Sequence, residues 1–290
     1  MTDTSTLRIL EPARGVFAYY DGRVPGARLH SPTENWLDDG AYSLGIASYA
    51  IVEGSEAIVF DSHISLDHAR AVRQHLEGLG VTRFKLVLSH WHDDHVAGNA
   101  VFSDGPIIAH RLTRDALAAN RAKLESGNPP IRPLVMPTDG FDDEMELTAG
   151  RRIVRALHFD IHSADGVVLH VPDAGLLLAG DVVEDTVTYI SEADRTPTHV
   201  SELGRLATLS FSSILPAHGD PERIEAGGYD SGLIAANRSY LMRLLAGEGR
   251  DGAPLSSFVA EDLAAGRIGY FEPYEAVHQA NLKALAAVEL

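Results

Sequence analysis

The chain has 290 residues, of which 45% are hydrophobic and 22% are charged, the balance of a globular protein with a core of ordinary size. Its formal net charge of −17 would repel nucleic-acid phosphates, and Arg151-Arg152 is only a pair of basic residues, so we expect no nucleic-acid partner. The absence of cysteine excludes disulfides and thiolate chemistry and fits a reducing compartment. With no long apolar run and no secretory signal in the first residues, we expect a cytoplasmic protein that does not bind membranes.

The first half of the chain shows alternating strand and helix patterns. Apolar and β-branched runs bounded by turn residues predict strands at residues 17–23, 46–52, 57–60, 84–88 and 106–110. The turn at 53–56 makes a hairpin of the second and third of these strands. Helical spacing predicts a helix at 66–80 with Ser65 as its N-cap, and composition predicts another at 113–126. Residues 24–40, which are rich in proline and polar residues, predict a loop near the site.

The second half is rich in predicted strands and ends in a helical tail. Short apolar runs predict strands at residues 144–147, 152–157, 166–171, 175–178 and 211–215. Turn residues separate them at 137–140 and 172–175. A helix is expected at 198–209, and the chain from residue 231 onward is expected to be helical with an interruption at 247–252.

The densest set of metal-binding side chains follows directly after a predicted strand. Residues 89–98 contain His90, His92, Asp94 and His95 in the pattern His-x-His-x-Asp-His. Imidazole nitrogen suits zinc and iron, and a carboxylate adds an oxygen ligand. Because open α/β sheets place their sites at the carboxyl ends of strands, this loop predicts a metal site. Surface histidines with Asp94 as a helix cap are the disfavoured alternative, since such clusters mark metal or catalytic sites.

Three later residues are candidates to complete the coordination. Asp181 follows Gly180 at the end of one apolar run, and His218 precedes Gly219 after another. Both glycines permit close approach of the backbone to a bulky group. His162 lies in a turn before a predicted strand. Each of the three is a weak signal alone, because a histidine or aspartate at a strand end is more often structural.

In this order, the motifs resemble those of the metallo-β-lactamase superfamily of hydrolases. The family's positions are filled in turn by Asp61, the core at 90–95, His162, Gly180-Asp181 and Pro216–Gly219. The resemblance implies an α/β protein with a four-layer αββα sandwich. It further implies a single domain over residues 1–290, with its core at about 45–220 and a helical C-terminal extension at 226–290.

The resemblance also assigns seven ligands to two metal ions. The first ion would be held by His90, His92 and His162. The second ion would be held by Asp94, His95 and His218, and Asp181 would bridge both. Zinc is the favoured metal, with iron or manganese as alternatives. In such sites the two ions share a hydroxide formed near neutral pH, which attacks the substrate carbonyl. Asp94 is the expected catalytic residue, because it would orient the hydroxide and move a proton.

The chain departs from the family pattern at several positions. His63 stands where the family usually has glycine, and it either faces the site or is a polar residue at a strand end. His158 competes with His162 for the ligand role, with His162 preferred. Asp61 is expected to orient a ligand imidazole. The lactone-hydrolysing branch often has a tyrosine three residues after the bridging aspartate, where this chain has Glu184, and Tyr189 is the candidate to replace it.

The function implied is a dinuclear metal-dependent hydrolase that cleaves an ester-like acyl bond of a small molecule: a thioester, a lactone or a carboxylic ester. Asp181 and the lack of cysteine favour the glyoxalase II and lactonase-like branch over true β-lactamases. The alternatives are a mononuclear iron persulfide dioxygenase, a phosphodiesterase of the same superfamily and a metal-binding protein without enzymatic activity. The substrate stays open, and a homo-oligomer is compatible with the sequence. Aromatic stretches at 227–230 and 270–274 fit either a substrate pocket or helix packing.

Overall fold

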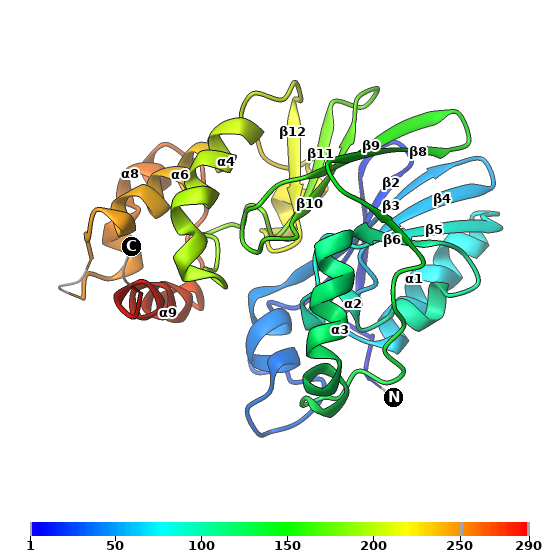
Figure 1. Ribbon diagram of the computed structural model, residues 1–290, viewed down its shortest axis with the longest axis horizontal. Helices are drawn as coiled ribbons and strands as arrows, with labels where there is room; N and C mark the ends of the chain where they lie inside the picture. The colour runs from blue at the N-terminus through cyan, green and yellow to red at the C-terminus, as the bar shows by residue number, and fades with distance from the viewer. Residues whose placement is uncertain (1, 250–251, 289–290) are drawn as a thin grey trace.

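Two β-sheets lie face to face, and helices cover their outer surfaces, in the computed structural model, which describes residues 2–249 and 252–288 (Figure 1). The chain passes through one sheet and then the other, so each sheet is built from one half of the sequence. The four-layer αββα sandwich implied by the sequence motifs is therefore confirmed.

The first sheet has seven strands in sequence order. They are β1 (Arg8–Ala13), β2 (Val16–Asp21), β3 (Ile46–Glu53), β4 (Glu56–Phe60), β5 (Arg83–Val87), β6 (Ile107–His110) and β7 (Asp139–Phe141). Strands β1 to β4 pair antiparallel, whereas β4 to β7 pair parallel. The predicted hairpin is confirmed, because Glu53 pairs with Glu56 across its turn.

The second sheet has five strands in the order β12-β11-β10-β9-β8. They are β8 (Glu144–Ala149), β9 (Arg152–His158), β10 (Val167–Val171), β11 (Leu176–Gly180) and β12 (Ser213–Pro216). All neighbours pair antiparallel except β11 and β12, which run parallel. The carboxyl ends of these two strands therefore lie at the same edge of the sheet.

The helices fall into an N-terminal set against the first sheet and a C-terminal set. The longer ones are α1 (Leu66–Gly78), α3 (Arg111–Ser126), α4 (Thr196–Leu206), α6 (Gly232–Leu245) and α9 (Tyr274–Ala286). The shorter ones are α2 (Asp93–Val96), α5 (Pro221–Glu225), α7 (Leu255–Phe258) and α8 (Ala260–Ala264), with helical turns η1 (Leu37–Tyr42), η2 (Asn99–Phe102) and η3 (Ala193–Arg195). Among the described residues, no helix combines the length and apolarity needed to cross a bilayer.

Alternation of side chains along the strands separates two cores. Tyr49 and Phe60 of the first sheet face the second sheet and pack with Leu178 in the larger apolar cluster between the sheets. Val59, the neighbour of Phe60, points outward instead and packs with Val72 of α1. The first sheet is therefore packed on both faces, against the second sheet on one side and against α1 on the other.

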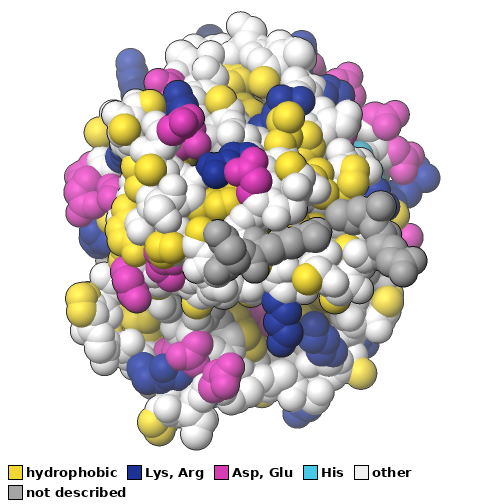
Figure 2. Space-filling model, turned by 90° about the vertical axis from the view of Figure 1, so that its left-hand side faces the viewer, with side chains coloured by type: hydrophobic (Ala, Val, Ile, Leu, Met, Phe, Trp, Pro, Cys, Tyr) yellow, Lys and Arg dark blue, Asp and Glu magenta, His cyan; other side chains and the backbone are white. Residues whose placement is uncertain are grey.

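The helices α6, α8 and α9 form a module beside the second sheet (Figure 1). Helix α4 connects them to the sandwich by packing on α6. The outward face of this module carries basic, acidic and apolar side chains interspersed with one another (Figure 2). The predicted helical tail is confirmed, and the predicted interruption falls between α6 and α7, although Arg250 and Asp251 lie outside the described residues.

The differences from the sequence-based predictions include an edge strand, a short strand and a helical turn. Strand β1 was not predicted, because it contains Pro12 and its residues are mostly exposed. It is an edge strand whose pairing with β2 shifts register between Leu10 and Ala13, and proline is tolerated at such places in a sheet. Strand β7 is only three residues long and falls where a turn was predicted. The prediction that residues 24–40 form only a loop is wrong at its end, where the helical turn η1 begins at Leu37.

Candidate metal centre

Loops that follow strands of both sheets meet at one edge of the sandwich. The loops after β5, β9, β11 and β12 carry residues 90–95, His162, Asp181 and His218 respectively. Backbone hydrogen bonds join these loops, because the Val167 N–H donates to the Ser89 carbonyl at 2.8 Å and the Ala217 N–H donates to the Gly180 carbonyl at 2.9 Å. The seven residues predicted as ligands are thereby brought together.

The first ligand group consists of His90, His92 and His162. The Nδ1 atom of His92 lies 2.9 Å from Nε2 of His90 and 3.0 Å from Nε2 of His162. The rings of His90 and His162 are buried. Three ring nitrogens thus converge beside Asp181 in an arrangement that could hold one metal ion.

The second ligand group consists of Asp94, His95 and His218. The Oδ2 atom of Asp94 lies 3.3 Å from Nε2 of His218, and its Oδ1 atom lies 3.5 Å from Nε2 of His95. Both imidazoles are buried, whereas the Asp94 side chain stays 17% exposed. These ligand atoms are also close enough together to hold one ion.

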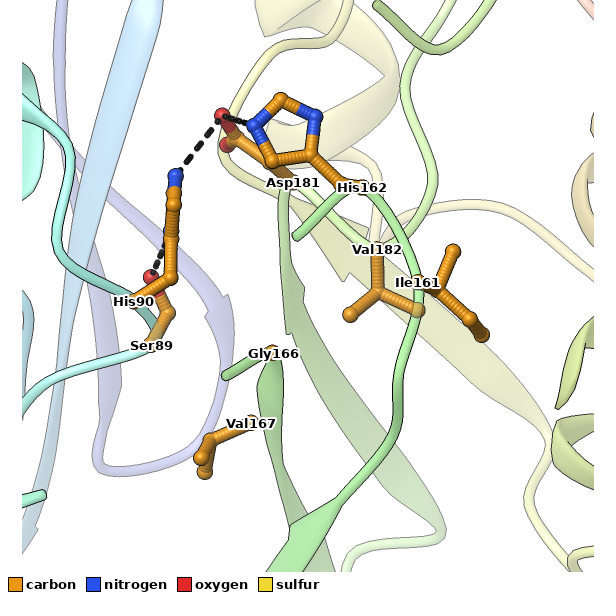
Figure 3. Close-up of a pocket in the computed structure, with 8 residues that line it drawn as sticks. All are labelled: Ser89, His90, Ile161, His162, Gly166, Val167, Asp181 and Val182. Atoms are coloured by element: carbon orange, nitrogen blue, oxygen red, sulfur yellow. Dashed lines mark hydrogen bonds and ion pairs between the residues drawn. The ribbon is translucent and has the colours of Figure 1, made fainter. Parts of the chain in front are cut away.

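Asp181 lies between the two groups. Figure 3 shows the nitrogens of His90 and His162 pointing at its carboxylate, each at 3.6 Å from Oδ2. The same oxygen lies 3.3 Å from Nε2 of His95 and 3.6 Å from Nε2 of His218. One carboxylate oxygen therefore faces two imidazoles of each group, which is the position that a bridging ligand would occupy.

Hydrogen bonds on the far side of the imidazoles fix which nitrogen faces the centre. Nδ1 of His162 donates to the Tyr189 carbonyl at 3.0 Å, and Nδ1 of His218 donates to the Gly45 carbonyl at 2.7 Å. Because a carbonyl can only accept, each Nδ1 must carry the proton. In the neutral rings, the Nε2 atoms that face the centre then carry lone pairs.

The unpaired atoms of the centre fit a bound cation. Lone pairs that face one another at these distances repel unless a proton or a metal ion lies between them. Nε2 of His95 and Oδ1 of Asp181 are also buried without a hydrogen-bond partner among the described residues. Buried polar atoms are rarely left unpaired. The donor set, imidazole nitrogen with carboxylate oxygen, suits zinc.

Burial and the carboxylates give the two groups different protonation. Burial lowers the pKa of every imidazole in the first group, that of His92 to about 3 and that of His162 to about 4. Burial also disfavours the charged forms of His95 and His218, but the neighbouring carboxylates, chiefly Asp181 and Asp94, together outweigh burial and raise the pKa of both imidazoles well above the ordinary value. The first group is therefore neutral at neutral pH, and metal binding to the second group must displace protons.

Apolar side chains close the inner side of the centre. Ile161, Val167 and Val182 line a narrow space between the sheets, together with His90 and Asp181 (Figure 3). That space has no room for a water molecule. Charge interactions are stronger beside such an apolar wall than in water. A substrate would therefore reach the centre from the opposite side, where the loops lie.

Asp61 lies behind the second ligand group. Its Oδ2 atom accepts a hydrogen bond from Nδ1 of His95 at 2.8 Å, and its Oδ1 atom accepts one from the Ser89 N–H at 2.7 Å. The side chain is buried. This placement agrees with the expectation that Asp61 orients a ligand imidazole, since such a partner fixes both ring orientation and tautomer.

We expect Asp61→Ala to weaken zinc binding about 10- to 100-fold, because His95 would lose the acceptor that holds its ring. Zinc titration against a chromophoric chelator measures this affinity. Asp61→Asn keeps one acceptor for two donors and is expected to lose less. Equal affinities for the wild-type protein and both variants would contradict a role of Asp61 in orienting His95.

His63 lies close to the centre but outside both ligand groups. Its buried ring stacks on that of His68 at a centroid distance of 4.7 Å. His68 in turn lies 2.9 Å from a carboxylate oxygen of Asp21. Nδ1 of His63 accepts a hydrogen bond from the Ile64 N–H at 2.9 Å. Nδ1 and one face of the His63 ring therefore have structural partners, whereas Nε2 is buried without a hydrogen-bond partner among the described residues.

Tyr189 and Glu184 lie on the side of His162. The exposed fraction of Tyr189 is 43%, and its ring centroid lies 6.1 Å from that of His162. Glu184 is buried, with Oε1 at 3.9 Å from Nδ1 of His162. Burial raises the pKa of Glu184 to about 7. The sequence motifs assign no role to Glu184, which directly follows the apolar pair Val182-Val183.

His158 is placed away from the ligand groups, so only His162 of the two competing histidines lies in the centre. Nε2 of His158 lies 2.8 Å from the Ala164 carbonyl, and its ring stacks on His110 at 4.0 Å between centroids. These contacts give it a structural role at the end of β9.

We therefore expect His158→Ala to leave the metal content per chain unchanged, as measured by elemental analysis. Some stability should be lost with the stacked ring and its hydrogen bond, which a thermal unfolding curve would register. His162→Ala is the matched variant that should lose metal. The reverse pattern would show that the wrong histidine has been assigned to the centre.

A third group of metal-binding side chains, Asp160, Glu192 and His199, lies beside the His162 loop. Arg195 already pairs with it, contacting the Asp160 carboxylate through both Nε and Nη2 and approaching Glu192 at 3.5 Å. Glu192 also accepts the Ala164 N–H at 2.9 Å. Because the guanidinium offsets the negative charge of the carboxylates, we interpret this group as an ion-pair cluster that stabilises the His162 loop, and not as a metal site.

The two aromatic stretches left open by the sequence serve mainly in packing. Tyr229 and Tyr274 are buried, whereas Tyr270 is exposed. The Tyr274 hydroxyl donates to Glu184 at 3.0 Å. The Tyr229 hydroxyl donates to the neighbouring carboxylate, that of Asp185, at 2.8 Å. Both stretches therefore connect the C-terminal helices to the segment after Asp181.

Comparison with known proteins agrees with this geometry. The family model described as the metallo-beta-lactamase superfamily matches residues 42–218, more than half of the chain. A linear primary-alkylsulfatase of Pseudomonas sp. (strain ATCC 19151) is 23% identical, over 59% of this chain and 41% of that protein. The chain thus spans about two fifths of the length of this curated relative.

Similar solved structures include a metallo-beta-lactamase from Pontibacter korlensis, at a TM-score of 0.62 and 16% identity over 81% of this chain and 99% of that one. The DIM-1 metallo-beta-lactamase gives a TM-score of 0.61 at 18% identity, over 81% of this chain and 96% of that one. At such identities the similarity establishes the fold, and the chemistry must be argued from the residues of the centre.

Proposed function

Because the chain belongs to the metallo-β-lactamase superfamily, we propose that it is a metal-dependent hydrolase with two divalent zinc ions. The observation that carries the proposal is the position of Asp181, whose Oδ2 atom lies 3.3–3.6 Å from two imidazoles of each ligand group. The first ion belongs to the first ligand group and the second ion to the second, with Asp181 shared by both.

Bound ions of this kind supply Lewis acidity and lower the pKa of a coordinated water to about 7. The protein's own contribution is to hold and move protons around them. Asp94 is suited to this, because one carboxylate oxygen faces each imidazole of its group and the side chain stays 17% exposed toward solvent. It could accept the proton released during hydrolysis and deliver it to the leaving group.

We propose an ester-like acyl substrate of small size: a thioester, a lactone or a carboxylic ester. The exposed ring of Tyr189 beside His162 offers an apolar surface with one hydroxyl, as small-molecule sites commonly do. The absence of cysteine and the presence of Asp181 support the ester-hydrolysing branches, those of glyoxalase II and the lactonases, over true β-lactamases.

A second candidate substrate class is the sulfate ester. It rests on the similarity to a linear primary-alkylsulfatase, of which the match covers 41%. A sulfate monoester would place a singly charged anionic group against the same two cations, whereas an acyl ester would place a neutral carbonyl there. The two substrate classes therefore differ in the charge of the group that would face the ions.

The deciding experiment is a hydrolysis screen with metal analysis on the same sample. Panels of lactones, thioesters, aryl esters, phosphoesters and alkyl sulfates should be compared in zinc-loaded protein. Two metals per chain with turnover of an acyl ester supports the first proposal, and turnover of alkyl sulfates alone supports the second. One iron per chain with oxygen uptake on a persulfide overturns both, in favour of a dioxygenase.

A further inference from the structure

The C-terminal helices reach the metal centre through buried polar side chains. Asn237 of α6 and Asn281 of α9 are both fully buried. Asn237 exchanges hydrogen bonds with the backbone of Glu184, at 3.0 Å to its carbonyl and 3.4 Å from its N–H. Buried amides in helix packing are costly unless every polar atom is paired, so their partners indicate what they do.

Asn281 forms hydrogen bonds on both sides of Tyr189, in the segment that follows Asp181. Its Oδ1 atom accepts the Ile190 N–H at 2.8 Å, and its Nδ2 atom donates to the Thr188 carbonyl at 2.9 Å. The second Nδ2 hydrogen has a partner in the Tyr240 hydroxyl at 3.1 Å. Both donor hydrogens are therefore used, and the partners allow only this orientation of the amide.

The residue between these contacts is Tyr189, whose carbonyl accepts the hydrogen bond from Nδ1 of His162 at 3.0 Å. The Tyr189 carbonyl and the Ile190 N–H belong to one planar peptide unit and point in opposite directions. Holding the N–H on Asn281 therefore aims the carbonyl at His162. The preceding peptide is also held at both ends, by Asn281 at the Thr188 carbonyl and by Glu184 Oε1 at the Tyr189 N–H, at 2.8 Å.

We propose that Asn281 is a positioning residue for the metal ligand His162, although it lies more than a hundred residues later in the chain. It fixes the peptide whose carbonyl accepts the hydrogen bond from Nδ1–H of His162, and so keeps the lone pair of Nε2 directed at the centre. This inference rests on the proposed metal centre. It gives the C-terminal helical module a function in the chemistry of the sandwich.

The test is zinc affinity measured with the metal alone in Asn281→Leu, whose side chain is similar in size but has no polar atoms. The Ile190 N–H and the Thr188 carbonyl would lose their partners, and the Tyr189 carbonyl would be free to turn. We expect one of the two zinc ions to bind about 10- to 100-fold more weakly, with the other little changed. Leu285→Ala, a buried apolar truncation one turn further along α9, is the matched control for lost packing.

A second readout follows the proton itself. In cobalt-substituted protein, the N–H protons of ligand imidazoles are shifted out of the normal NMR range, so their exchange with water can be followed individually. The His162 N–H should exchange faster in Asn281→Leu, while the His218 N–H, which donates to the Gly45 carbonyl and not to the segment held by Asn281, serves as the internal reference. If Asn281→Leu does not fold, Asn281→Ala leaves room for a bridging water and is expected to show a smaller change in the same direction.

The outcomes separate this inference from the proposed function. A wild-type protein that binds no zinc at the centre overturns the proposed function itself. A wild-type protein that binds two ions, with both affinities and the His162 exchange rate unchanged in the Asn281 variants, overturns only the positioning role. Equal loss at both ions in Asn281→Leu and Leu285→Ala would also overturn it, because general destabilisation would then explain the effect.

Discussion

Asp181→Ala should reduce the metal content from two ions towards one per chain and slow hydrolysis by about 100- to 10,000-fold. The physical reason is the position of the carboxylate, whose Oδ2 atom is within 3.6 Å of two imidazoles of each ligand group. Two dications a few ångströms apart repel strongly, and a shared carboxylate is the charge that offsets this repulsion. Elemental analysis and initial rates on the best substrate of the screen measure both effects.

Asp93→Ala is the appropriate control, because Asp93 is a carboxylate between His92 and Asp94 that belongs to neither ligand group. It should retain both ions and most of the rate. Circular dichroism would show whether the Asp181 variant remains folded. Unchanged stoichiometry and rate in Asp181→Ala would refute the bridging assignment.

Removal of the metals by a chelator should abolish hydrolysis and lower the thermal stability, with both restored by added zinc. A ligand that binds only the folded state stabilises it by about 2.7–4.1 kcal/mol at 100 to 1,000 times its dissociation constant. For a chain of 290 residues, with an unfolding entropy of about 2.1 cal/mol/K per residue, that corresponds to a fall in melting temperature of about 4–7 °C for each ion removed. Differential scanning calorimetry with and without chelator measures the shift.

The metal-free protein should still unfold cooperatively, since the two apolar clusters that hold the sheets include no ligand residue. His162→Ala treated in the same way is the control, because it should show a smaller shift on chelation. A melting temperature and a rate that do not respond to chelator would contradict a metal-dependent function.

The parts of the centre that were predictable from the sequence are those with local signals. His90 to His95 lie within six residues, and Asp181 and His218 each adjoin a glycine at the end of an apolar strand. The need for glycine is visible at Gly180, whose φ is +54° and where an added Cβ would lie 2.7 Å from the Cβ of Ser89. Such constraints are recorded in residue type and spacing, so they can be found without coordinates.

The supporting residues could not be found in this way, because their signals are not local. Asn281 lies in an amphipathic helix and looks like an ordinary polar position, and its partners are backbone atoms about ninety residues earlier in the chain. The sequence points to the ring of Tyr189 as a candidate substrate group, whereas its hydrogen bond with His162 is made by the backbone carbonyl, which every residue type has. Backbone acceptors leave no trace in composition or spacing.

The division of the ligands between the two halves of the sandwich has a consequence for the order of folding. Residues 90–95 follow a strand of the first sheet, whereas His162, Asp181 and His218 follow strands of the second. An ion can gain its full set of donors only after the sheets have docked, since a chain with separated sheets offers at most half of them. Bound metal would therefore mainly slow unfolding and have little effect on the folding rate.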